Sequence, residues 1–435
     1  MEEPRRTPAT LALKGAGAVS AAMLLITGCG ADDGPPVLTW YINPDDGGQQ
    51  ALAQQCTEEA GGEYEIRTSL LPNDAPAQRE QLARRLAAGD ASLDIMSLDP
   101  VFVPEFAEPG FLAPVPEDVA ERTTEDTLEG SLLSASWEDE VVTVPFWANT
   151  QILWYRESVA EEAGLDMDQP VTWDEIIEAA QETDTYLGVQ GVRAESITVW
   201  LNALIESQDE HIVVDPQAAS EDLETALDSE AGTRAAEIFS TIGTEGLGGP
   251  GISSMDEEQS MRLFQGENGS FMVNWPFVWA ATNAAAEEGT LDQELLDDIA
   301  WAQYPRVDAE TLSAPPLGGI NLGVGAESEH PELAYDAIEC IVSPENQVEY
   351  FLTNGNPPSS EAAFEDERIV EEFPMAEDIR EAIDNGAPRP QTPFYNEISE
   401  TLQQLFSPLS SVDPDSTPGT ADEHIGEVLR GERLL

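Results

Sequence analysis

The stretch from Phe264 to Trp279 reads FQGENGSFMVNWPFVW, and its residue types determine the local fold of this part of the chain. The apolar run from Ser270 to Val273 follows the breakers Gly266 to Gly269 and has the length expected of a buried strand. Pro276 cannot donate a ladder hydrogen bond and restricts the residue before it, so the strand must end with Trp275 extended. An indole held there, beside an amide and downstream of carboxylates, can stack on the apolar face of a sugar ring. The alternative is that Trp275 is a core residue beside an ordinary turn.

Length and charge limit the classes of protein and partner. The chain has 435 residues, of which 41% are hydrophobic, so it is long enough for two domains with packed cores. There are 85 acidic and 18 basic residues, and the formal net charge is -67. A field this negative repels phosphate backbones and anionic headgroups, which argues against nucleic acid and anionic substrates. The charge does not identify a ligand, and a surface kept soluble in salty or crowded surroundings explains it better.

The N-terminus has the pattern of an export signal. Arg5, Arg6 and Lys14 precede an apolar run from Ala16 to Ile26, which is too short to span a bilayer permanently and has the form of a signal-peptide core. The run ends in Ile26-Thr27-Gly28-Cys29, which resembles a bacterial lipoprotein box. In lipoproteins the cysteine becomes the first mature residue and carries the lipid, and the alternative is a cleaved soluble signal. Either way we expect the mature protein to act outside the cytoplasm.

The first third of the mature chain alternates between strand and helix patterns. We expect strands at 37–42, 64–71 and 93–98 and helices at 49–59 and 76–89. This rhythm is typical of an α/β fold in which helices cover both faces of a parallel sheet. Ligands of such sheets bind beyond the carboxyl ends of the strands, and Asn43 and Asp99 follow two of these ends.

The rest of the chain has further periodic segments. Thr172 and Glu175 form a capping-box pattern at the start of a helix. We expect further strands at 151–155 and 320–324, helical segments at 223–227, 235–242, 291–299, 331–341, 345–352 and 397–406, and a surface segment rich in turn formers at 413–421.

Two cysteines remain after Cys29, at positions 56 and 340. A pair of cysteines in an exported protein is compatible with a disulfide, although this one would require the last third of the chain to fold back onto the first domain. Two separate buried thiols are the alternative.

Several motifs in order resemble one family. These are the lipoprotein signal, the β/α start, VTWDEI (171–176), FQGENGSFMVNWP (264–276), GGINLGV (318–324) and PRPQTPFYNEIS (388–399). The chain is similar to extracellular solute-binding proteins of family 1, the substrate-binding lipoproteins of sugar ABC importers, and within them to actinobacterial trehalose- and maltose-binding lipoproteins. The likeness covers nearly all of the mature chain.

The resemblance implies a two-lobed, type II periplasmic-binding-protein-like α/β fold with a ligand cleft between the lobes. After a signal peptide at 1–28 and a tether at 29–36, we expect lobe 1 at 37–145 and 317–354, and lobe 2 at 146–316 and 357–435. This division puts Cys56 and Cys340 in one lobe, which favours a disulfide. Matching motifs imply ligand contacts from Asn43, Asp99, Asn149, Glu258, Trp275, Gly319 and Arg389. Individually, these residues are equally compatible with caps, turns, a solvated helix face or a surface ion pair.

The implied function is capture of a neutral disaccharide, trehalose or maltose-like, by hinge closure, and its delivery to membrane permease subunits. We expect a monomer, lipid-anchored on the extracellular face of the cell membrane, with no cofactor, metal or enzymatic activity. The main alternative is an exported glycoside hydrolase with paired carboxylates. The three histidines are isolated, and no Ser-His-Asp order, zinc spacing or phosphate loop is present.

Overall fold

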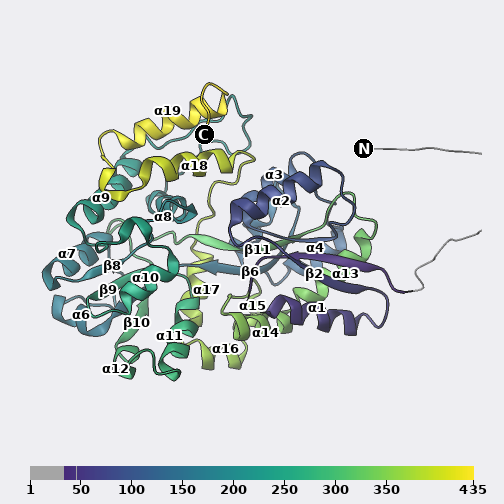
Figure 1. Cartoon of the computed structure of the whole chain (residues 1–435), viewed down its shortest axis with the longest axis horizontal. Coiled ribbons are helices and arrows are strands. Elements are labelled where there is room, and N and C mark those ends of the chain that lie inside the picture. The colour runs from purple at the N-terminus through teal and green to yellow at the C-terminus, as the bar shows by residue number, and fades with distance from the viewer. Residues whose placement is uncertain (1–33, 46) are drawn as a thin grey trace, which may run out of the picture. The chain divides into compact units, whose positions relative to one another are not determined.

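The computed structural model of the protein describes residues 34–45 and 47–435 (Figure 1). The expected signal peptide at 1–28, the expected lipidation of Cys29 and most of the expected tether lie outside the described residues. Within the described part of the chain, no helix is both long and apolar enough to cross a bilayer.

The first sheet has five strands in the order β2-β1-β3-β11-β6. Their bounds are β1 Val37–Ile42, β2 Glu65–Leu70, β3 Ile95–Leu98, β6 Val144–Thr150 and β11 Leu317–Gly323. β1 runs parallel to β2 and β3, whereas β11 is antiparallel to β3 and β6. The carboxyl ends of β1, β3 and β6 therefore lie at the same edge as the amino end of β11. The parallel start that the sequence predicts is confirmed.

The second sheet has four strands in the order β10-β7-β9-β8. Their bounds are β7 Ile152–Arg156, β8 Tyr186–Gly188, β9 Gly269–Asn274 and β10 Ile299–Ala302. Only Gln151 separates β6 of the first sheet from β7 of the second, so the chain passes directly between the sheets. β7 and β9 are antiparallel with Ile152 opposite Asn274, so β9 ends at the edge where the chain enters from the first sheet. A small hairpin joins β4 Ser136–Trp137 to β5 Glu140–Val141.

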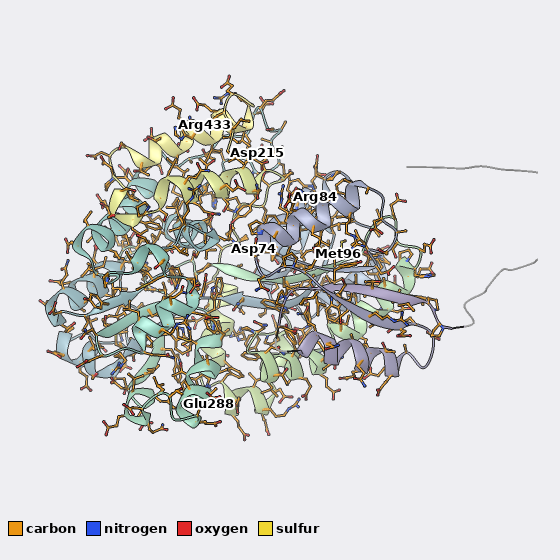
Figure 2. The ribbon with its side chains drawn as sticks, viewed as in Figure 1. Asp74, Arg84, Met96, Asp215, Glu288 and Arg433 are labelled. Carbon is orange, nitrogen blue, oxygen red and sulfur yellow. A yellow bond between two sulfur atoms is a disulfide. The ribbon has the colours of Figure 1, made fainter. Side chains whose placement is uncertain are left out.

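Helices surround both sheets (Figure 1). Those near the first sheet are α1 Gly48–Glu59, α2 Ala75–Ala87, α3 Val103–Ala107, α4 Glu117–Thr124, α13 Pro331–Ile341 and α14 Pro344–Asn354, with the 3-10 turn Pro100–Phe102. Asp74 accepts a hydrogen bond from the N–H of Ala77 and so caps α2, whose last turn carries Arg84 (Figure 2).

The second sheet carries α6 Glu157–Ala163, α7 Trp173–Thr183, α8 Glu195–Glu206, α9 Glu230–Glu245, α10 Glu257–Phe264, α11 Phe277–Glu287 and α12 Gln293–Leu296, with the 3-10 turn Ile252–Ser254. The predicted capping box of Thr172 and Glu175 is present at the start of α7. The remaining helices are α5 Glu129–Ser134, α15 Glu361–Phe364, α16 Glu367–Glu372, α17 Ala376–Asp384, α18 Tyr395–Phe406 and α19 Thr417–Leu429, with the 3-10 turn Leu409–Ser411.

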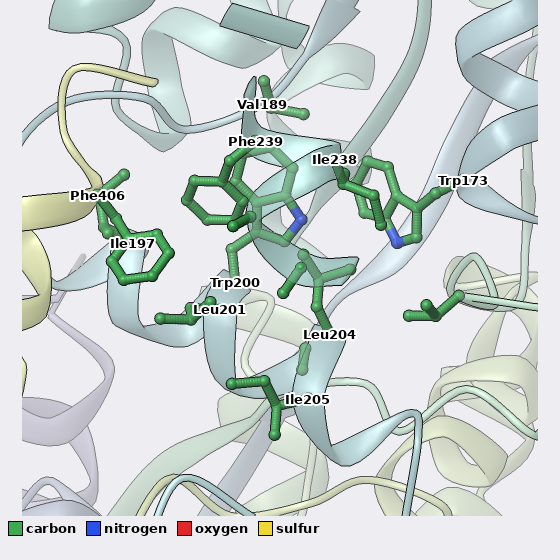
Figure 3. Close-up of a cluster of buried hydrophobic side chains, with 14 of the residues drawn as sticks. Trp173, Val189, Ile197, Trp200, Leu201, Leu204, Ile205, Ile238, Phe239 and Phe406 are labelled. Carbon is green, nitrogen blue, oxygen red and sulfur yellow. The ribbon is translucent and has the colours of Figure 1, made fainter. Parts of the chain in front are cut away.

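Aromatic side chains form the core beside the second sheet (Figure 3). Trp200 of α8 stacks on Phe239 of α9, with ring centroids 4.2 Å apart, and its centroid lies 5.3 Å from that of Trp173. A separate core beside the first sheet contains Trp40 and Phe146. Each sheet thus has its own packed core, which keeps the residues at the sheet edges in fixed positions.

The structure corrects three expectations about secondary structure. Residues 223–227 are irregular, and their two leucines are buried without a helix. The helix expected at 291–299 is only α12, because the chain turns into β10 at Ile299. The surface segment expected at 413–421 contains the start of α19, where Ala421, Ile425 and Leu429 recur at a spacing of four and are buried.

A disulfide joins Cys56 of α1 to Cys340 of α13. Cys56 is fully buried among the side chains of the first core. The bond therefore ties an early helix to a late one on the same sheet.

Candidate ligand-binding site

Trp275 follows the last residue of β9, and its half-buried indole reaches the first sheet. A Cβ atom added to Gly318 of β11 would lie 3.4 Å from two carbons of the indole, Cζ3 and Cη2. The side chain of Asn274 holds this turn, because its Oδ1 accepts from the N–H of Trp275 at 2.9 Å. The indole is thus supported by the backbone of the facing sheet.

Asn149 and Gly319 lie beside this contact. Asn149 of β6 pairs with Gly318, and its Cβ would lie 3.6 Å from a Cβ atom added there. Gly319 has φ of +122°, and an added Cβ would lie 2.3 Å from the carbonyl oxygen of Trp147. A glycine is required at 319 by the backbone and by the close approach of β6.

Arg389 is buried between two carboxylates from different parts of the fold. Its Nη2 donates to Oδ1 of Asp99 at 2.9 Å, and its Nη1 donates to Oε1 of Glu195 at 2.8 Å. Asp99 follows β3 of the first sheet, whereas Glu195 begins α8 beside the second. Although burial opposes the charge, the two carboxylates hold the pKa of Arg389 above its ordinary value.

Tyr395 extends this network. Its hydroxyl donates to Glu195, which also accepts from the hydroxyl of Ser399 at 2.7 Å. Burial, and then the charge of Glu195, raise the pKa of Tyr395 well above its ordinary value. The ring packs edge-on against Phe102, with centroids 6.0 Å apart, so apolar and polar contacts both cross between the two sheets here.

Asn43 lies at the same edge of the first sheet, after β1. Its backbone oxygen accepts from Nε2 of Gln49 at 2.9 Å, but its buried side-chain oxygen has no partner among the described residues. The same is true of Trp147 Nε1, Thr150 Oγ1 and Gln151 Oε1, around the crossing from β6 to β7. Buried polar atoms without a protein partner are uncommon, and three of them lie around this crossing.

Glu258 lies outside this group. Its side chain is 67% exposed and forms an ion pair with Arg262, one turn further along α10. The neighbouring Glu257 is half-buried, and its backbone oxygen accepts from Nδ2 of Asn274 at 2.9 Å. Burial, and then the charges of Asp256 and Glu258, raise the pKa of the Glu257 carboxyl. Of these two neighbouring carboxylates, that of Glu257 is therefore the one turned toward the protein.

The sequence reasoning missed Glu195, Tyr395 and Glu257. Asp256 and Gln259 form a capping box at the start of α10, and this pattern was a sequence signal that the residue after Asp256 begins the helix. No local signal marks Glu195, because its role depends on a segment almost two hundred positions later. Among the residues that the structure describes, no group of three or more His, Cys, Asp or Glu side chains is arranged to hold a metal ion.

The combined arrangement has an aromatic plane, amides, carboxylates and a guanidinium at the facing edges of two sheets. Amide and carboxylate oxygens accept hydrogen bonds from hydroxyls, and amide N–H groups donate to them. Groups of these kinds can hydrogen-bond to the hydroxyls of a ligand.

Comparison with known proteins agrees with this geometry. A family model for bacterial extracellular solute-binding proteins matches residues 45–348. A curated relative from Deinococcus radiodurans, described as "Probable ABC transporter-binding protein", is 22% identical over 369 residues, which cover 81% of this chain and 82% of the relative.

Solved structures share the fold. The maltose-bound MalE3 of T. maritima has a TM-score of 0.75 at 23% identity, covering 91% of this chain and 100% of that one. A solute-binding protein of an ABC transporter from Agrobacterium radiobacter, in complex with ribitol, has a TM-score of 0.73 at 16% identity, covering 91% and 99%. The GacH receptor of Streptomyces glaucescens, studied with acarbose, has a TM-score of 0.72 at 20% identity, covering 91% and 98%. The predicted two-lobed α/β solute-binding fold is confirmed.

Proposed function

The chain belongs to the family of bacterial extracellular solute-binding proteins, and from this premise we propose that it captures a neutral di- or oligosaccharide, such as trehalose or maltose, for an ABC importer. We place one lobe at 37–150 and 317–354, with its end moved from 145 to 150 because β6 belongs to the first sheet, and the other lobe at 151–316 and 357–435. The ligand binds between them and stabilises their closed arrangement, which the membrane permease subunits then recognise. Cys29 carries the lipid that keeps the monomeric protein on the extracellular face of the membrane.

The contact between Trp275 and Gly318 carries this proposal. It brings a half-buried indole from the end of one sheet onto a side-chain-free stretch of backbone in the other. Aromatic rings stack on the CH faces of sugars, and a glycine leaves room beside the ring. Asn149 adjoins the same contact, and Asp99 and Arg389 add polar groups near the amino end of β11.

The proposed ligand contacts are those of Asn43, Asp99, Asn149, Trp275, Gly319 and Arg389, with Glu257 in place of Glu258. The side chains of Asp99, Asn149 and Arg389 are each oriented by another group, so a sugar whose hydroxyls point elsewhere leaves buried atoms unpaired. Such unpaired atoms cost about 1–3 kcal/mol each, which makes the site selective. The strongly negative surface disfavours anionic ligands.

A thermal-shift screen tests the proposal against a panel of trehalose, maltose, maltotriose, glucose, ribitol and glucose 6-phosphate. We expect at least one neutral sugar to raise the melting temperature, and the phosphorylated sugar to have no effect. A panel in which no neutral carbohydrate shifts the melting temperature contradicts the proposal. Incubation with trehalose and maltose, followed by product analysis, distinguishes it from a glycoside hydrolase, since a binding protein releases no glucose.

A further inference from the structure

The turn after β3 and the start of α18 face each other between the two proposed lobes (Figure 1). Tyr395, the first residue of α18, is buried together with Phe102 in a cluster of side chains from β1, β3 and α2. Further along the same helix, Ile398, Leu402 and Phe406 are buried in the core of the second sheet. The start of α18 is therefore a point at which a helix of one lobe packs against the other lobe.

The packing at this boundary is incomplete. The ion pair of Asp99 with Arg389 crosses the boundary, and so does the edge-on contact of Phe102 with Tyr395. Beside these contacts lies a crevice of about 180 Å³, which is lined by Pro76 of α2 on one side and by α18 on the other. The crevice leaves room for α18 to approach α2 when the lobes close.

Glu397 follows Tyr395 by two residues and has an unpaired buried oxygen. Its Oε2 has no hydrogen-bond partner among the described residues. Burial raises the pKa of its carboxyl, a hydrogen bond from its own backbone and then the charge of Arg79 on α2 lower it, and the charges of Glu105 and Glu400 raise it further. A buried carboxylate loses hydration, and only a partner compensates for that loss. Glu397 thus lies within electrostatic range of a cation on the other lobe, yet the structure holds no ion pair between the two.

Arg79 has a donor that is available for this carboxylate. Its Nε and Nη2 bind Glu105 of α3, with Nη2 2.7 Å from Oε1, and both residues belong to the first lobe. Its Nη1 forms no hydrogen bond to another described residue, and its side chain is 21% exposed. The guanidinium carbon lies 5.9 Å from the ring centroid of Phe102, whose ring also contacts Tyr395. Arg79 is therefore held at the boundary beside the start of α18.

A guanidinium carries five N–H donors, so it can bond to two carboxylates at once. Arg389 does this, because it binds Glu195 of its own lobe and Asp99 of the other lobe. Arg79 has the partner within its own lobe, Glu105, and lacks the partner on the other lobe. The carboxylate that faces it from α18 is unpaired.

We propose that Arg79 and Glu397 form an ion pair between the lobes when a bound sugar closes them. Glu105 keeps its bonds to Arg79 throughout and so holds the guanidinium toward α18. Because the new pair exists only in the closed arrangement, it strengthens sugar binding without touching the sugar and adds nothing to the stability of the free protein. This inference rests on the proposed function and assigns two positioning residues to its closing step.

A double-mutant cycle tests the pair. Calorimetry measures the affinities of wild type, Arg79→Met, Glu397→Gln and the double variant for trehalose, maltose and maltotriose. Urea denaturation measures the stabilities of the same four proteins without sugar. The control cycle uses Arg84→Met and Glu80→Gln, because these residues form an ion pair within the same helix, α2, and their side chains are 74% and 57% exposed.

Each substitution in the test cycle should weaken sugar binding about fivefold, and the double variant should bind within about twofold of the single variants, because either substitution already removes the pair. The effects of the same substitutions on the stability of the sugar-free protein should be additive. The control cycle should leave sugar affinity within about twofold of wild type.

Unchanged affinity in both single variants, or losses that multiply in the double variant, overturns the inference, because the two residues then do not act as a pair in the bound state. Coupling of the same size in the sugar-free protein also overturns it, because the pair is then permanent. If Arg79→Met melts early, Arg79→Gln takes its place in the cycle. Wild-type protein that binds none of the sugars instead refutes the proposed function, and the inference with it.

Discussion

Nη2 of Arg389 and Oδ1 of Asp99 form a 2.9 Å ion pair that joins the segment before α18 to the carboxyl end of β3. Nη1 of the same guanidinium binds Glu195 at the start of α8. A planar fork holds its donors in fixed directions toward the two carboxylates, whereas an ammonium group is a compact charge on a flexible stem. Arg389 therefore contributes to the stability of the free protein as well as to the proposed site.

Arg389→Met should lower the free energy of unfolding by roughly 3 kcal/mol, the lower end of the range for a broken buried ion pair. The value is low in that range because the side chains of Asp99 and Glu195 remain 20% and 24% exposed. Urea denaturation measures the loss. Arg84→Met, at an ion pair with Glu80 that is mostly exposed, is the control and should change stability by less than about 1 kcal/mol. Equal effects of the two substitutions contradict the bridging role.

Trp275→Ala should weaken sugar binding about tenfold or more, since a stacked ring contributes about 0.5–1.5 kcal/mol beyond the area that it buries. The substitution should affect the stability of the free protein less than it affects sugar binding, because the indole is only half-buried. Trp279 provides the contrast: it is also half-buried, but its Nε1 donates to the oxygen of Glu372 and its ring packs on Trp301. Trp279→Ala should therefore reduce the melting temperature and spare binding. The reverse pattern in calorimetry and thermal melts would return Trp275 to a core role.

The sequence predicts the Trp275 turn because its signals are local. A short apolar strand and a proline fix where β9 must end, and β9 does end at Asn274. The strand rhythm likewise predicts which ends carry Asn43 and Asp99. By contrast, the partners of Arg389 come from positions 99 and 195, and no periodicity relates such distant residues.

The side chains of Glu258 and Glu257 differ in exposure, and this difference is also set by the tertiary structure. The two carboxylates are neighbours in the sequence, and only the rotation of α10 relative to Asn274 decides which one faces the protein. The absence of a helix at 223–227 is also a tertiary effect, since the two leucines there are buried by surrounding elements without help from helical periodicity.

Gly319→Ala should lower stability by about 2 kcal/mol or more, because it combines a left-handed backbone with a close contact. The contact is the 2.3 Å approach of the added Cβ to the oxygen of Trp147. Gly89 is a control position that has the left-handed backbone without the close contact. Its φ is +67°, but nothing lies within 4 Å of an added Cβ. Gly89→Ala should therefore cost only about 1 kcal/mol. Chemical denaturation measures the stability loss of each variant. Equal losses would exclude the contact with Trp147 as a cause.

Loss of the bond between Cys56 and Cys340 should lower the free energy of unfolding by about 2–5 kcal/mol, since it closes a loop with a sequence separation of 284 residues. The double variant Cys56→Ala with Cys340→Ala tests this by urea denaturation. In a Cys29→Ser background, thiol labelling of the denatured but unreduced protein should find no reactive cysteine. Two labelled thiols would show that the bond is absent in solution.

Glu257→Gln should stabilise the protein at neutral pH and weaken its sugar binding. Burial, and then the charges of Asp256 and Glu258, raise the pKa of Glu257 above its ordinary value of 4.5, so the folded state holds this proton more tightly than the unfolded state. Wild-type stability associated with this group is therefore fully present below pH 4.5 and falls as the pH rises through the raised pKa.

The gain from Glu257→Gln should accordingly appear at pH 7 and vanish below pH 4.5, because there both states of the wild type carry a protonated carboxyl. Thermal melts across this pH range measure the difference. Glu258→Gln is the control at the neighbouring position. The side chain of Glu258 is 67% exposed, so the stability of this variant should stay within about 0.5 kcal/mol of wild type and its sugar affinity should be unchanged. A larger loss of sugar affinity in Glu258→Gln than in Glu257→Gln would reverse the assignment, because it would mean that α10 presents its exposed carboxylate to the ligand.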